Sequence, residues 1–525
     1  MESVPRKTAQ KTKVQPEYLT RKIWKNCIDN QFVYPLKYFR PQTLSELVEI
    51  VKIAEQENCT VRAVGSGHSF SEILQTTDFL INCHGLNKPI ELNKNLLKSD
   101  DILKQINYDP DFLIHVENGI TIKDLNKHLD KNNLALYNMG AYDAQTIVGV
   151  ISTSTHGTGI CLGPIASSVV SIVLVGEGGI IYRIEPTDGI TDPIKYKIKF
   201  PENVLIQDDE WFNSILVSMG CMGIFYSVIL KVTSSYYLKE ERIAKINETY
   251  WEDVKRNLDI KQLLKDNRHF EIWINPYKIK GKHRCLMTKK NIYEGDYLKL
   301  PAGSRVRHWL IEFFAKYGEF IIRALFKYFY RFSARFIDMS LKQVIDYDGY
   351  IDKSFNVLHL GNANYVKGYS GEYAISLEDN LYIKAADKIL ELAEINIKFG
   401  MYHSAPISLR FVKQCDAYLS MMNGEDKCLI EVPILVGTHG GFQILQKIEN
   451  EFLKLSDIRP HWGQYHQLNA ATVDRLYPDL KKWKNVYNTL NQKGTFSNCF
   501  TERCGFKEKK SSIETNNNYE QPHGI

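Results

Sequence analysis

Three short runs of glycine and small hydroxyl residues, each joined to an apolar stretch, constrain the fold of this chain more than any other feature. The first, GSGHS (65–69), comes directly after TVRAV; the second, STSTHGTG (152–159), follows TIVGVI; the third, SMGCMGI (218–224), precedes FYSVILKV. Glycines directly after a strand let the backbone turn sharply, expose its N–H groups and approach a ligand closely. Taken alone, the first run is more often just a turn, and the second can be a plain Ser/Thr-rich loop.

The three runs offer different contacts to a bound ligand. A loop like the first usually holds a pyrophosphate, and the hydroxyls and open backbone of the second can donate to phosphate oxygens or to the edge of a planar cofactor. The small residues of the third let a flat ring lie against the backbone. The candidate cofactor-binding residues are Gly65, Ser66, Gly67, His68, Ser69, Ser152, Thr153, Ser154, Thr155, His156, Gly157, Gly159, Gly220, Gly223 and Ile224.

The length of 525 residues predicts two domains, because a chain this long exceeds a single compact core. Apolar residues make up 44% and charged residues 24%, which is the balance of an ordinary globular protein. The net charge of +5 is spread along the chain, and no helix-turn-helix, zinc-finger or RNA-binding motif accompanies it. We therefore expect no nucleic-acid partner.

The cysteines and the two ends of the chain indicate its surroundings. Ten cysteines form no CxxC pair and have no histidine nearby at metal-ligand spacing, so we expect no metal site and a reducing, intracellular compartment. The N-terminus, MESVPRKTAQKTKVQPEYLTRK, has no apolar core and does not resemble a secretory signal. The last residues, KEKKSSIETNNNYEQPHGI, have too few apolar side chains to pack and are predicted to be disordered.

Hydrophobic spacing predicts an α+β fold in two units. Between about 24 and 232, helices alternate with short strands; a helix is predicted over 43–59 with Thr43 as its cap, and another opens at Thr121. The region from about 240 to 490 adds longer elements. The predicted strands are 60–64, 111–120, a hairpin at 167–184 that turns at Gly178 and Gly179, and 268–277; a long helix is predicted over 377–395.

The segment 305–337, RVRHWLIEFFAKYGEFIIRALFKYFYRFSARFI, differs from the rest of the chain. It is dense in aromatic and branched residues, yet arginine or lysine recurs every few positions. No apolar stretch in it reaches the roughly 20 residues that span a bilayer. A helix lying in a membrane interface fits this pattern, and so does a helix packed on the second domain with its charges directed outward.

Together these motifs resemble the aldonolactone oxidases (the gulono-, galactono- and arabinonolactone group) within the vanillyl-alcohol-oxidase type of FAD proteins. The segment PLKYFRPQTLSELVEIV (35–51) and the three glycine-rich runs match in order and spacing. Further matches are EIWINPY (271–277), GEYAIS (371–376), PISLRF (406–411), HWGQYH (461–466) and GTFSNCF (494–500). The resemblance spans roughly residues 20–506, and three FAD-loop motifs in register are a specific signal.

The resemblance implies a two-domain FAD-binding fold of the vanillyl-alcohol-oxidase/PCMH type. The FAD domain then comprises 20–235 and a returning stretch at 490–506, and the substrate domain comprises 236–489, with the amphipathic segment inside it. The tails are 1–19 and 507–525. The animal gulonolactone enzymes carry a similar aromatic stretch and are membrane-associated, so the resemblance also implies peripheral membrane contact.

The resemblance gives His68 a particular role. It falls at the position that carries the covalent bond to the 8α-methyl group of the flavin in many relatives, whereas other proteins of this fold hold FAD without a bond. Such a bond prevents loss of the cofactor and raises the flavin potential, so that a less reducing substrate can deliver its hydride.

The sequence departs from the family at the substrate side. Relatives carry Glu-x-Arg on one strand and a lysine at the end of a His-Trp-x-Lys turn, whereas this chain has Ser408, Arg410 and Gln464 at those positions. Gln464 can still donate a hydrogen bond to the flavin edge, but a neutral donor stabilises an anion less than a cation does. His466, close by, is a candidate base or donor, or merely supports the turn. The candidate catalytic residues are Arg410, Gln464, Ser408 and His466.

The resulting functional hypothesis is an FAD-dependent oxidoreductase that oxidises a hydroxyl-bearing carbon of a sugar lactone, polyol or similar small substrate, with oxygen as the acceptor. Two alternatives stay open. One is a membrane-associated alkene reductase in which NAD(P)H reduces the flavin, and the other is a flavin-binding protein without catalysis.

Overall fold

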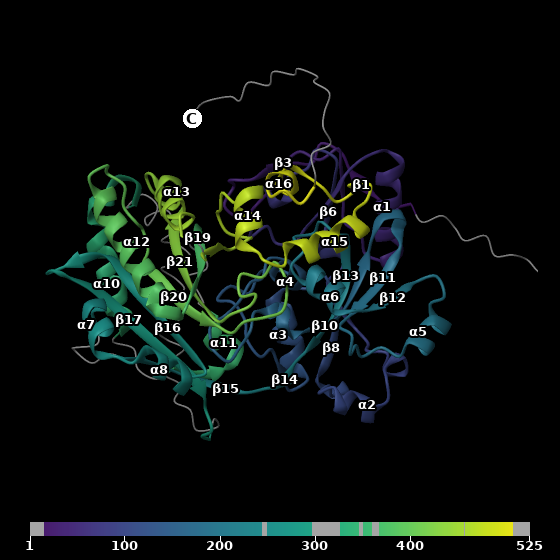
Figure 1. Cartoon of the computed structure of the whole chain (residues 1–525), viewed down its shortest axis with the longest axis horizontal. Coiled ribbons are helices and arrows are strands. Elements are labelled where there is room, and N and C mark those ends of the chain that lie inside the picture. The colour runs from purple at the N-terminus through teal and green to yellow at the C-terminus, as the bar shows by residue number, and fades with distance from the viewer. Residues whose placement is uncertain are drawn as a thin grey trace, which may run out of the picture.

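Three β-sheets organise the chain (Figure 1). The structure is a computed structural model that describes residues 15–243, 249–296, 326–345, 350–359, 367–455 and 457–507. Most of the two predicted tails, and residues 305–325 of the amphipathic segment, lie outside these ranges. The mixture of helices and sheets confirms the predicted α+β class.

A four-stranded sheet in the first half carries the first glycine-rich run. Its order is β1 (Tyr18–Leu19), β4 (Lys37–Phe39), β6 (Phe79–Asn82) and β5 (Val61–Val64), and the last three strands are parallel. The predicted helix is α1 (Leu44–Gln56), which begins where the Thr43 side chain accepts a hydrogen bond from the backbone N–H of Glu46. Its buried apolar face packs on this sheet.

A six-stranded sheet follows, with the order β12 (Val204–Gln207), β11 (Ile181–Glu185), β10 (Val169–Val175), β13 (Ile224–Lys231), β8 (Leu113–Glu117) and β7 (Pro89–Ile90). The β10–β11 hairpin is the predicted one, and both Gly178 and Gly179 have positive φ at its turn. The second predicted helix, α3 (Ile122–Lys131), begins at Thr121, whose side chain accepts from the N–H of Asp124.

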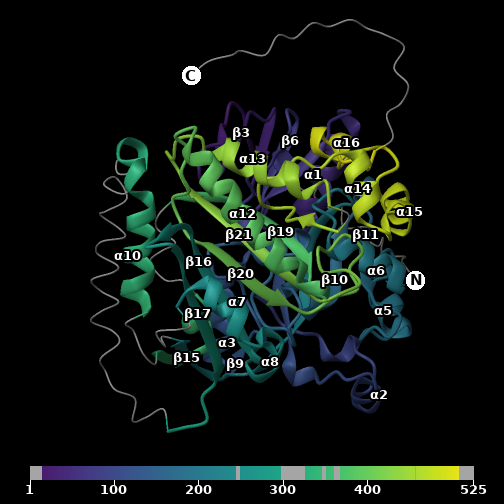
Figure 2. The same cartoon turned by 60° about the vertical axis from the view of Figure 1, so that its left-hand side comes forward.

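The second half of the chain forms an eight-stranded antiparallel sheet. Its order is β18 (Tyr350–Lys353), β15 (Tyr237–Ile243), β17 (Lys282–Ile292), β16 (His269–Ile279), β20 (Ile407–Val412), β21 (Lys427–Leu435), β19 (Gly368–Ser376) and β22 (Arg459–Pro460). Helices α12 (Leu381–Ile397) and α13 (Gly441–Phe452) lie across β19–β21 (Figure 2). They pack on the residues of one sheet face, such as Ile272, Leu409 and Ile430. Alternate residues therefore point to the opposite face.

Shorter elements complete the chain. The helices are α2 (Asp100–Gln105), α4 (Ile147–Ser152), α5 (Pro193–Lys199), α6 (Asp209–Leu216), α7 (Trp251–Asn257), α8 (Ile260–Asp266), α10 (Ser333–Ile345), α11 (Ser354–Leu358), α14 (Ala470–Leu476), α15 (Leu480–Leu490) and α16 (Cys499–Arg503). Two small sheets pair β2 (Trp24–Lys25) with β3 (Phe32–Val33) and β9 (Leu134–Ala135) with β14 (Thr233–Ser234). None of the described helices combines the length and the apolar character that crossing a bilayer requires.

The last helices return to the first half of the molecule. In Figure 1 the yellow helices α14–α16 lie over the blue and purple elements, and their apolar residues share a core cluster with α3, α4 and the six-stranded sheet. The indole N–H of Trp483 donates to the carbonyl of Val217 at 3.3 Å, and the N–H of Val61 donates to Thr495 O at 2.7 Å. The C-terminal stretch thus braces the strand that leads into the first glycine-rich run.

A buried arginine joins these parts. Arg62, on β5, is 1% exposed, and its guanidinium donates to four backbone carbonyls at 2.6–3.0 Å. The carbonyls belong to Ile73, Met219, Gly220 and Phe496. One side chain therefore connects the strand before the first run, the third run and the C-terminal segment.

Replacing Arg62 should destabilise the protein. In Arg62→Met four buried carbonyls lose their donor, and each unmet buried acceptor costs about 1–3 kcal/mol, so we expect a loss of roughly 3 kcal/mol or more after partial relaxation. Urea unfolding followed by tryptophan fluorescence measures the loss. Arg21→Met, at an exposed position, is the matched control and should change stability by less than about 0.5 kcal/mol. An Arg62→Met variant as stable as this control would contradict the bracing role.

Candidate functional site

The three glycine-rich runs meet at one cavity, where they face the eight-stranded sheet. Of the predicted cofactor-binding residues, those lining the cavity are Gly65, Ser66, Gly67, His68, Ser69, Ser152, Thr153, Thr155, His156, Gly220, Gly223 and Ile224. Two of the predicted catalytic residues, Arg410 and Gln464, line the same cavity. The structure therefore brings together side chains separated by up to about 400 positions in the sequence.

Three predicted cofactor-binding residues lie outside the cavity lining. Ser154 has a positive φ of 60°, which turns its fully buried hydroxyl toward the hydroxyl of Ser420 at 2.7 Å. A Cβ at Gly157 would collide with the side chain of Asn138, and the N–H of Gly159 donates to Phe411 O on β20 at 2.6 Å. These residues hold the second run in place against its neighbours.

Two predicted catalytic residues are also absent from the lining. Ser408 points its buried hydroxyl toward the Glu431 carboxylate, with 3.5 Å between Oγ and Oε2. His466 is buried behind the turn, its ring edge-on to Trp462 at 5.6 Å, and its Nδ1 accepts from the N–H of Leu468. Within the described part of the chain its Nε2 has no hydrogen-bond partner. The structure thus places His466 behind the turn and outside the cavity lining.

The first run holds His68 in a tight pocket. A Cβ at Gly65 would collide with the Thr146 side chain, and Gly67 adopts a φ of +70° that favours glycine. The His68 ring lies 4.0 Å from the Tyr142 ring, centroid to centroid, and its Nδ1 lies 3.7 Å from the Cys27 sulfur. Burial lowers the pKa of His68 to about 4, so its imidazole is neutral at pH 7.

The second and third runs form an adjoining wall of small residues. The Thr153 hydroxyl donates to Gly149 O at 2.9 Å, and the N–H of Met219 donates to Ser152 O at 3.2 Å, which ties the two runs together. A Cβ at Gly149 would lie 2.9 Å from the Thr146 hydroxyl, which would have to move, whereas one at Gly220 would meet only Arg62 at 3.8 Å. Side chains at these glycines would enter space beside the cavity. The glycines thus leave room for a flat group, and the adjacent loops offer backbone N–H donors for phosphates.

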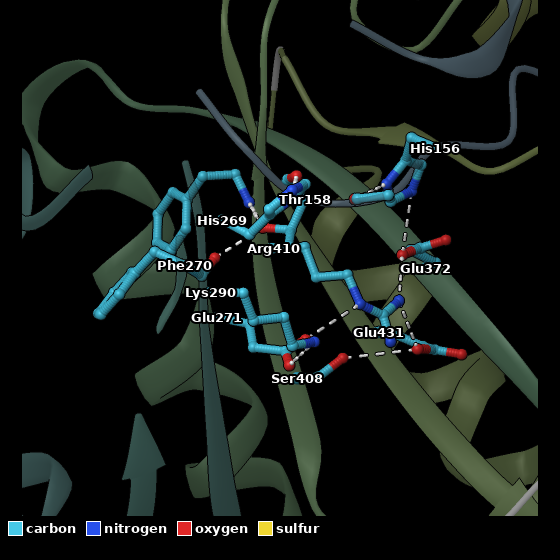
Figure 3. A network of polar contacts seen from close by, with 12 residues as sticks. His156, Thr158, His269, Phe270, Glu271, Lys290, Glu372, Ser408, Arg410 and Glu431 are labelled. Atoms are coloured by element: carbon cyan, nitrogen blue, oxygen red, sulfur yellow. Dashed lines mark hydrogen bonds and ion pairs between the residues drawn. The ribbon is translucent and has the colours of Figure 1, made fainter. Parts of the chain in front are cut away.

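The sheet supplies the charged wall, which Figure 3 shows from close by. Arg410 on β20 lies among three carboxylates from three other strands. Its Nη1 lies 2.9 Å from Glu431 Oε2 on β21 and 3.5 Å from Glu372 Oε1 on β19, and its Nε lies 3.9 Å from Glu271 Oε2 on β16. The other carboxylate oxygen of Glu271, Oε1, lies 3.0 Å from Nζ of Lys290 on β17. The cavity wall is therefore a buried network in which carboxylates outnumber the cation that they share.

The ionisation of this network follows from its charges. Burial alone would raise the pKa of Glu372. Its close contact with His156 is the largest opposing effect, and His461 and Arg410 add to it, so the pKa of Glu372 falls to about 2. Burial disfavours the charged form of Arg410. The nearby carboxylates of Glu431, Glu372 and Glu271 favour it and outweigh burial, so the pKa of Arg410 rises above its ordinary value. Both groups are charged at neutral pH.

A tight turn between β22 and α14 presents the remaining residues. Trp462 is fully buried and donates to Leu419 O at 2.7 Å, which anchors the turn. The N–H of His461 donates to Glu372 O at 2.9 Å, and Gly463 O accepts from the N–H of Phe70 at 3.0 Å. Gln464 accepts from the Ser370 hydroxyl at 2.6 Å. The turn thus joins the charged wall to the residues just after the first run.

Sequence reasoning missed Glu372, Glu431, His461 and Tyr142, all of which line the cavity. The signal for the two carboxylates was a lone glutamate inside an apolar strand, in GEYAIS and in LIEVPIL. A lone charge in such a run needs a buried partner. The sequence alone does not reveal which partner, because the strands that pair are far apart in the chain.

Comparison with known proteins gives two family matches. A model described as FAD binding domain matches residues 35–185, and a model described as D-arabinono-1,4-lactone oxidase matches residues 228–504. The chain is 25% identical over 484 residues to L-gulono-1,4-lactone dehydrogenase of Mycobacterium tuberculosis, covering 92% of this chain and 98% of that protein. It is 26% identical over 486 residues to L-gulonolactone oxidase of Bos taurus, covering 89% and 95%.

Solved structures support the same fold. A solvent-stable cholesterol oxidase superposes with a TM-score of 0.72 at 13% identity, covering 94% of this chain and all of that one. Cholesterol oxidase from B. sterolicum gives a TM-score of 0.70 at 12% identity, covering 93% and 97%. At this identity the likeness concerns the fold alone, and it confirms the predicted two-part FAD-binding architecture. Because the lactone oxidase model matches more than half of the sequence, the chain belongs to the D-arabinono-1,4-lactone oxidase family of FAD-dependent oxidoreductases.

Proposed function

We propose that this protein oxidises a hydroxyl-bearing carbon of a sugar lactone, or of a similar polyol, and passes the electrons to oxygen. The observation that carries the proposal is the charged wall of the cavity, with Arg410 and Glu431 beside three loops suited to FAD. When bound, FAD supplies the acceptor for the hydride of the substrate C–H bond. The chain itself must bind the hydroxyls, stabilise charge on the reacting oxygen and accept its proton.

The two ends of the Arg410–Glu431 pair suit these tasks. The guanidinium can donate to a substrate oxygen and stabilise the negative charge that grows on it as the C–H bond breaks. The Glu431 carboxylate can accept hydrogen bonds from substrate hydroxyls, orient the sugar and take the proton of the reacting hydroxyl. Gln464 and Ser370, joined by a hydrogen bond of 2.6 Å, add neutral polar groups beside this pair. Small polyhydroxylated substrates fit such a set better than apolar ones.

A lactone should bleach the flavin absorbance of the purified protein without oxygen. We expect L-gulono-1,4-lactone or D-arabinono-1,4-lactone to do so, and hydrogen peroxide to form under air. Arg410→Met should lower kcat/KM about 100-fold or more, because a charged donor to the reacting oxygen is lost. Arg331→Met, at an exposed position, is the control. Bleaching by NADPH but by no lactone or polyol would favour the alkene reductase, and bleaching by nothing would favour a non-catalytic flavoprotein.

We also propose that His68 carries FAD covalently. Its ring lines the cavity between Tyr142 and Cys27, and its low pKa of about 4 leaves a neutral imidazole with a free lone pair. A neutral nitrogen is the nucleophile that a bond to the flavin methyl group requires. A methyl C–H bond would break as the N–C bond forms, with its proton going to solvent and its electron pair to the flavin ring system, from which oxygen would take the two electrons. Gly65 and Gly67, which precede His68, set the path of the loop that brings the ring to the cavity lining.

Denaturation tests this bond directly. After acid precipitation of the native protein, the flavin absorbance should stay in the pellet, whereas His68→Ala should release its flavin into the supernatant. The variant should keep its fold and show a lower flavin midpoint potential. His128→Ala, on α3 and away from the cavity lining, should behave like the native protein. Release of all flavin from the native protein would disprove the bond and leave FAD binding untouched.

A third proposal concerns peripheral membrane contact through the amphipathic segment. In its described part, Tyr328, Phe329 and Phe332 are 67%, 60% and 48% exposed, and Arg331 and Arg335 are exposed beside them. Exposed aromatic rings flanked by cations suit the headgroup region of an anionic bilayer. The alternative, a helix packed on the second domain, leaves fewer of these rings in water.

Changing all three rings to serine should reduce co-sedimentation with anionic liposomes at least several-fold. The matched control is Ile194→Ser with Ile198→Ser on α5, which removes apolar side chains that are 73% and 77% exposed elsewhere on the surface. This control should bind like the native protein. Equal binding by the native protein and the triple variant would exclude the segment as the membrane contact.

A further inference from the structure

Two of the three carboxylates in the charged wall have donors of their own. The ammonium group of Lys290 donates a hydrogen bond to Oε1 of Glu271 at 3.0 Å. The Oε1 atom of Glu431 lies 3.1 Å from the Ser370 hydroxyl, and its Oε2 atom lies 2.9 Å from Nη1 of Arg410. Glu271 and Glu431 therefore have, within the protein, the contacts that a carboxylate removed from water requires.

Glu372 is the exception. It is 3% exposed and lines the cavity, yet no described residue donates a hydrogen bond to either oxygen of its carboxylate. Nε2 of His156 and Nη1 of Arg410 lie 3.2 and 3.5 Å from Oε1, but neither contact is a hydrogen bond. Buried polar groups without a hydrogen-bond partner are rare and costly. Glu372 therefore calls for a donor that the described chain does not supply.

Positive charge is not what Glu372 lacks, because Arg410 already lies beside Oε1. The missing contact is a hydrogen-bond donor. Figure 3 shows one oxygen of Glu372 turned toward His156 and Arg410, and the other turned away from both. The second oxygen, Oε2, is thus left to accept a hydrogen bond from a molecule in the cavity that Glu372 lines.

Strand register places Glu372 next to the group that holds the reacting oxygen. Glu372 on β19 pairs directly with Glu431 on β21, and both side chains line the cavity. Side chains paired in this way have Cβ atoms about 4.5–5.5 Å apart. Nη1 of Arg410 lies 2.9 Å from Glu431 and 3.5 Å from Glu372. Two carboxylates on either side of one guanidinium can each accept a hydrogen bond from one of two hydroxyls on adjacent carbons.

We propose that Glu372 is a specificity-determining residue that accepts a hydrogen bond from the hydroxyl next to the reacting one. The site then selects substrates with two adjacent hydroxyls over substrates with one. This inference rests on the proposed function, in which Arg410 and Glu431 hold the reacting hydroxyl, and it adds the substrate class to it. Glu372 makes and breaks no covalent bond in this role, so its contribution is recognition.

Matched lactones test the selection. D-Erythrono-1,4-lactone carries hydroxyls on two adjacent ring carbons, and 2-hydroxy- and 3-hydroxy-γ-butyrolactone each carry one of the two. The native protein should have a kcat/KM for the diol about 10-fold or more above that for either single-hydroxyl lactone, because a hydrogen bond to a charged group contributes that much. In Glu372→Gln this ratio should fall to near one, mainly through a higher KM for the diol.

A matched control separates recognition from charge. Glu271→Gln also removes a carboxylate beside Arg410, but Glu271 lies outside the cavity lining and bonds to Lys290. This variant should lower turnover of all three lactones in equal proportion and keep the native ratio. Glu372→Met, which cannot accept a hydrogen bond, should lower the ratio at least as far as Glu372→Gln. A native ratio in both Glu372 variants would overturn the proposal.

A binding measurement without turnover makes the test independent of the lactone assay. 1,4-Anhydroerythritol has two adjacent ring hydroxyls and 3-hydroxytetrahydrofuran has one, and neither has the lactone carbonyl. Melting curves of the flavin-loaded protein under nitrogen, followed by tryptophan fluorescence, give the affinity from the shift that each ligand produces. The native protein should bind the diol about 10-fold more tightly than the single alcohol. Glu372→Gln should bind the two alike.

The two proposals fail on different results. If no lactone or polyol reduces the flavin, the proposed oxidation is wrong, and the preference for the diol is still measured by binding. If lactones are oxidised but the native protein binds the diol and the single alcohol alike, the proposed oxidation stands and Glu372 does not select for a second hydroxyl.

Discussion

The ion pairs of Arg410 with Glu271, Glu372 and Glu431 are the interaction on which the substrate side of this protein depends. They join four adjacent strands, β16, β20, β21 and β19, on the face opposite to α12 and α13. Because side chains alternate along a strand, a slip of one residue in any pairing would move a charge into the apolar layer beneath the helices. The network therefore raises the free energy of each misregistered pairing and fixes the geometry of the cavity wall.

The two sides of the cavity are built in different ways. The cofactor side consists of short loops whose backbone and glycines do most of the binding, and Arg62 holds these loops together from behind through four carbonyls. The substrate side consists of side chains on a rigid sheet. The turn at 461–464 joins the two, since it bonds both to β19 and to the residues just after His68. Rigid support on both sides is what holds reacting groups within a productive distance.

The contrast between local loops on the cofactor side and paired strands on the substrate side explains what the sequence could and could not predict. The loops were found because a glycine-rich run after a strand is a local pattern, and the caps at Thr43 and Thr121 are local in the same sense. The partners of Arg410 depend on which strands pair, and Glu372 and Glu431 come from strands 38 and 21 positions away from it. Ser154 lies outside the cavity lining because a single positive φ turns its side chain away, which no spacing rule shows. His466 lies close in sequence to Gln464 but behind the turn, against Trp462.

Strand register also determines which charged group lies beside Ser408. Ser408 pairs directly with Glu431 across β20 and β21, so the carboxylate reappears on the neighbouring strand, within 2.9 Å of Arg410. The site thus has a carboxylate on the strand next to the neutral Ser408, and Gln464 adds a neutral polar group rather than a charge. A wall with three buried carboxylates needs positive charge close by, because an excess of buried anions is costly and opposes the gain of electrons by a bound cofactor. Arg410 supplies that charge beside all three carboxylates, and Lys290 supplies it on the other side of Glu271, so the loss of either cation would leave buried anions without compensation.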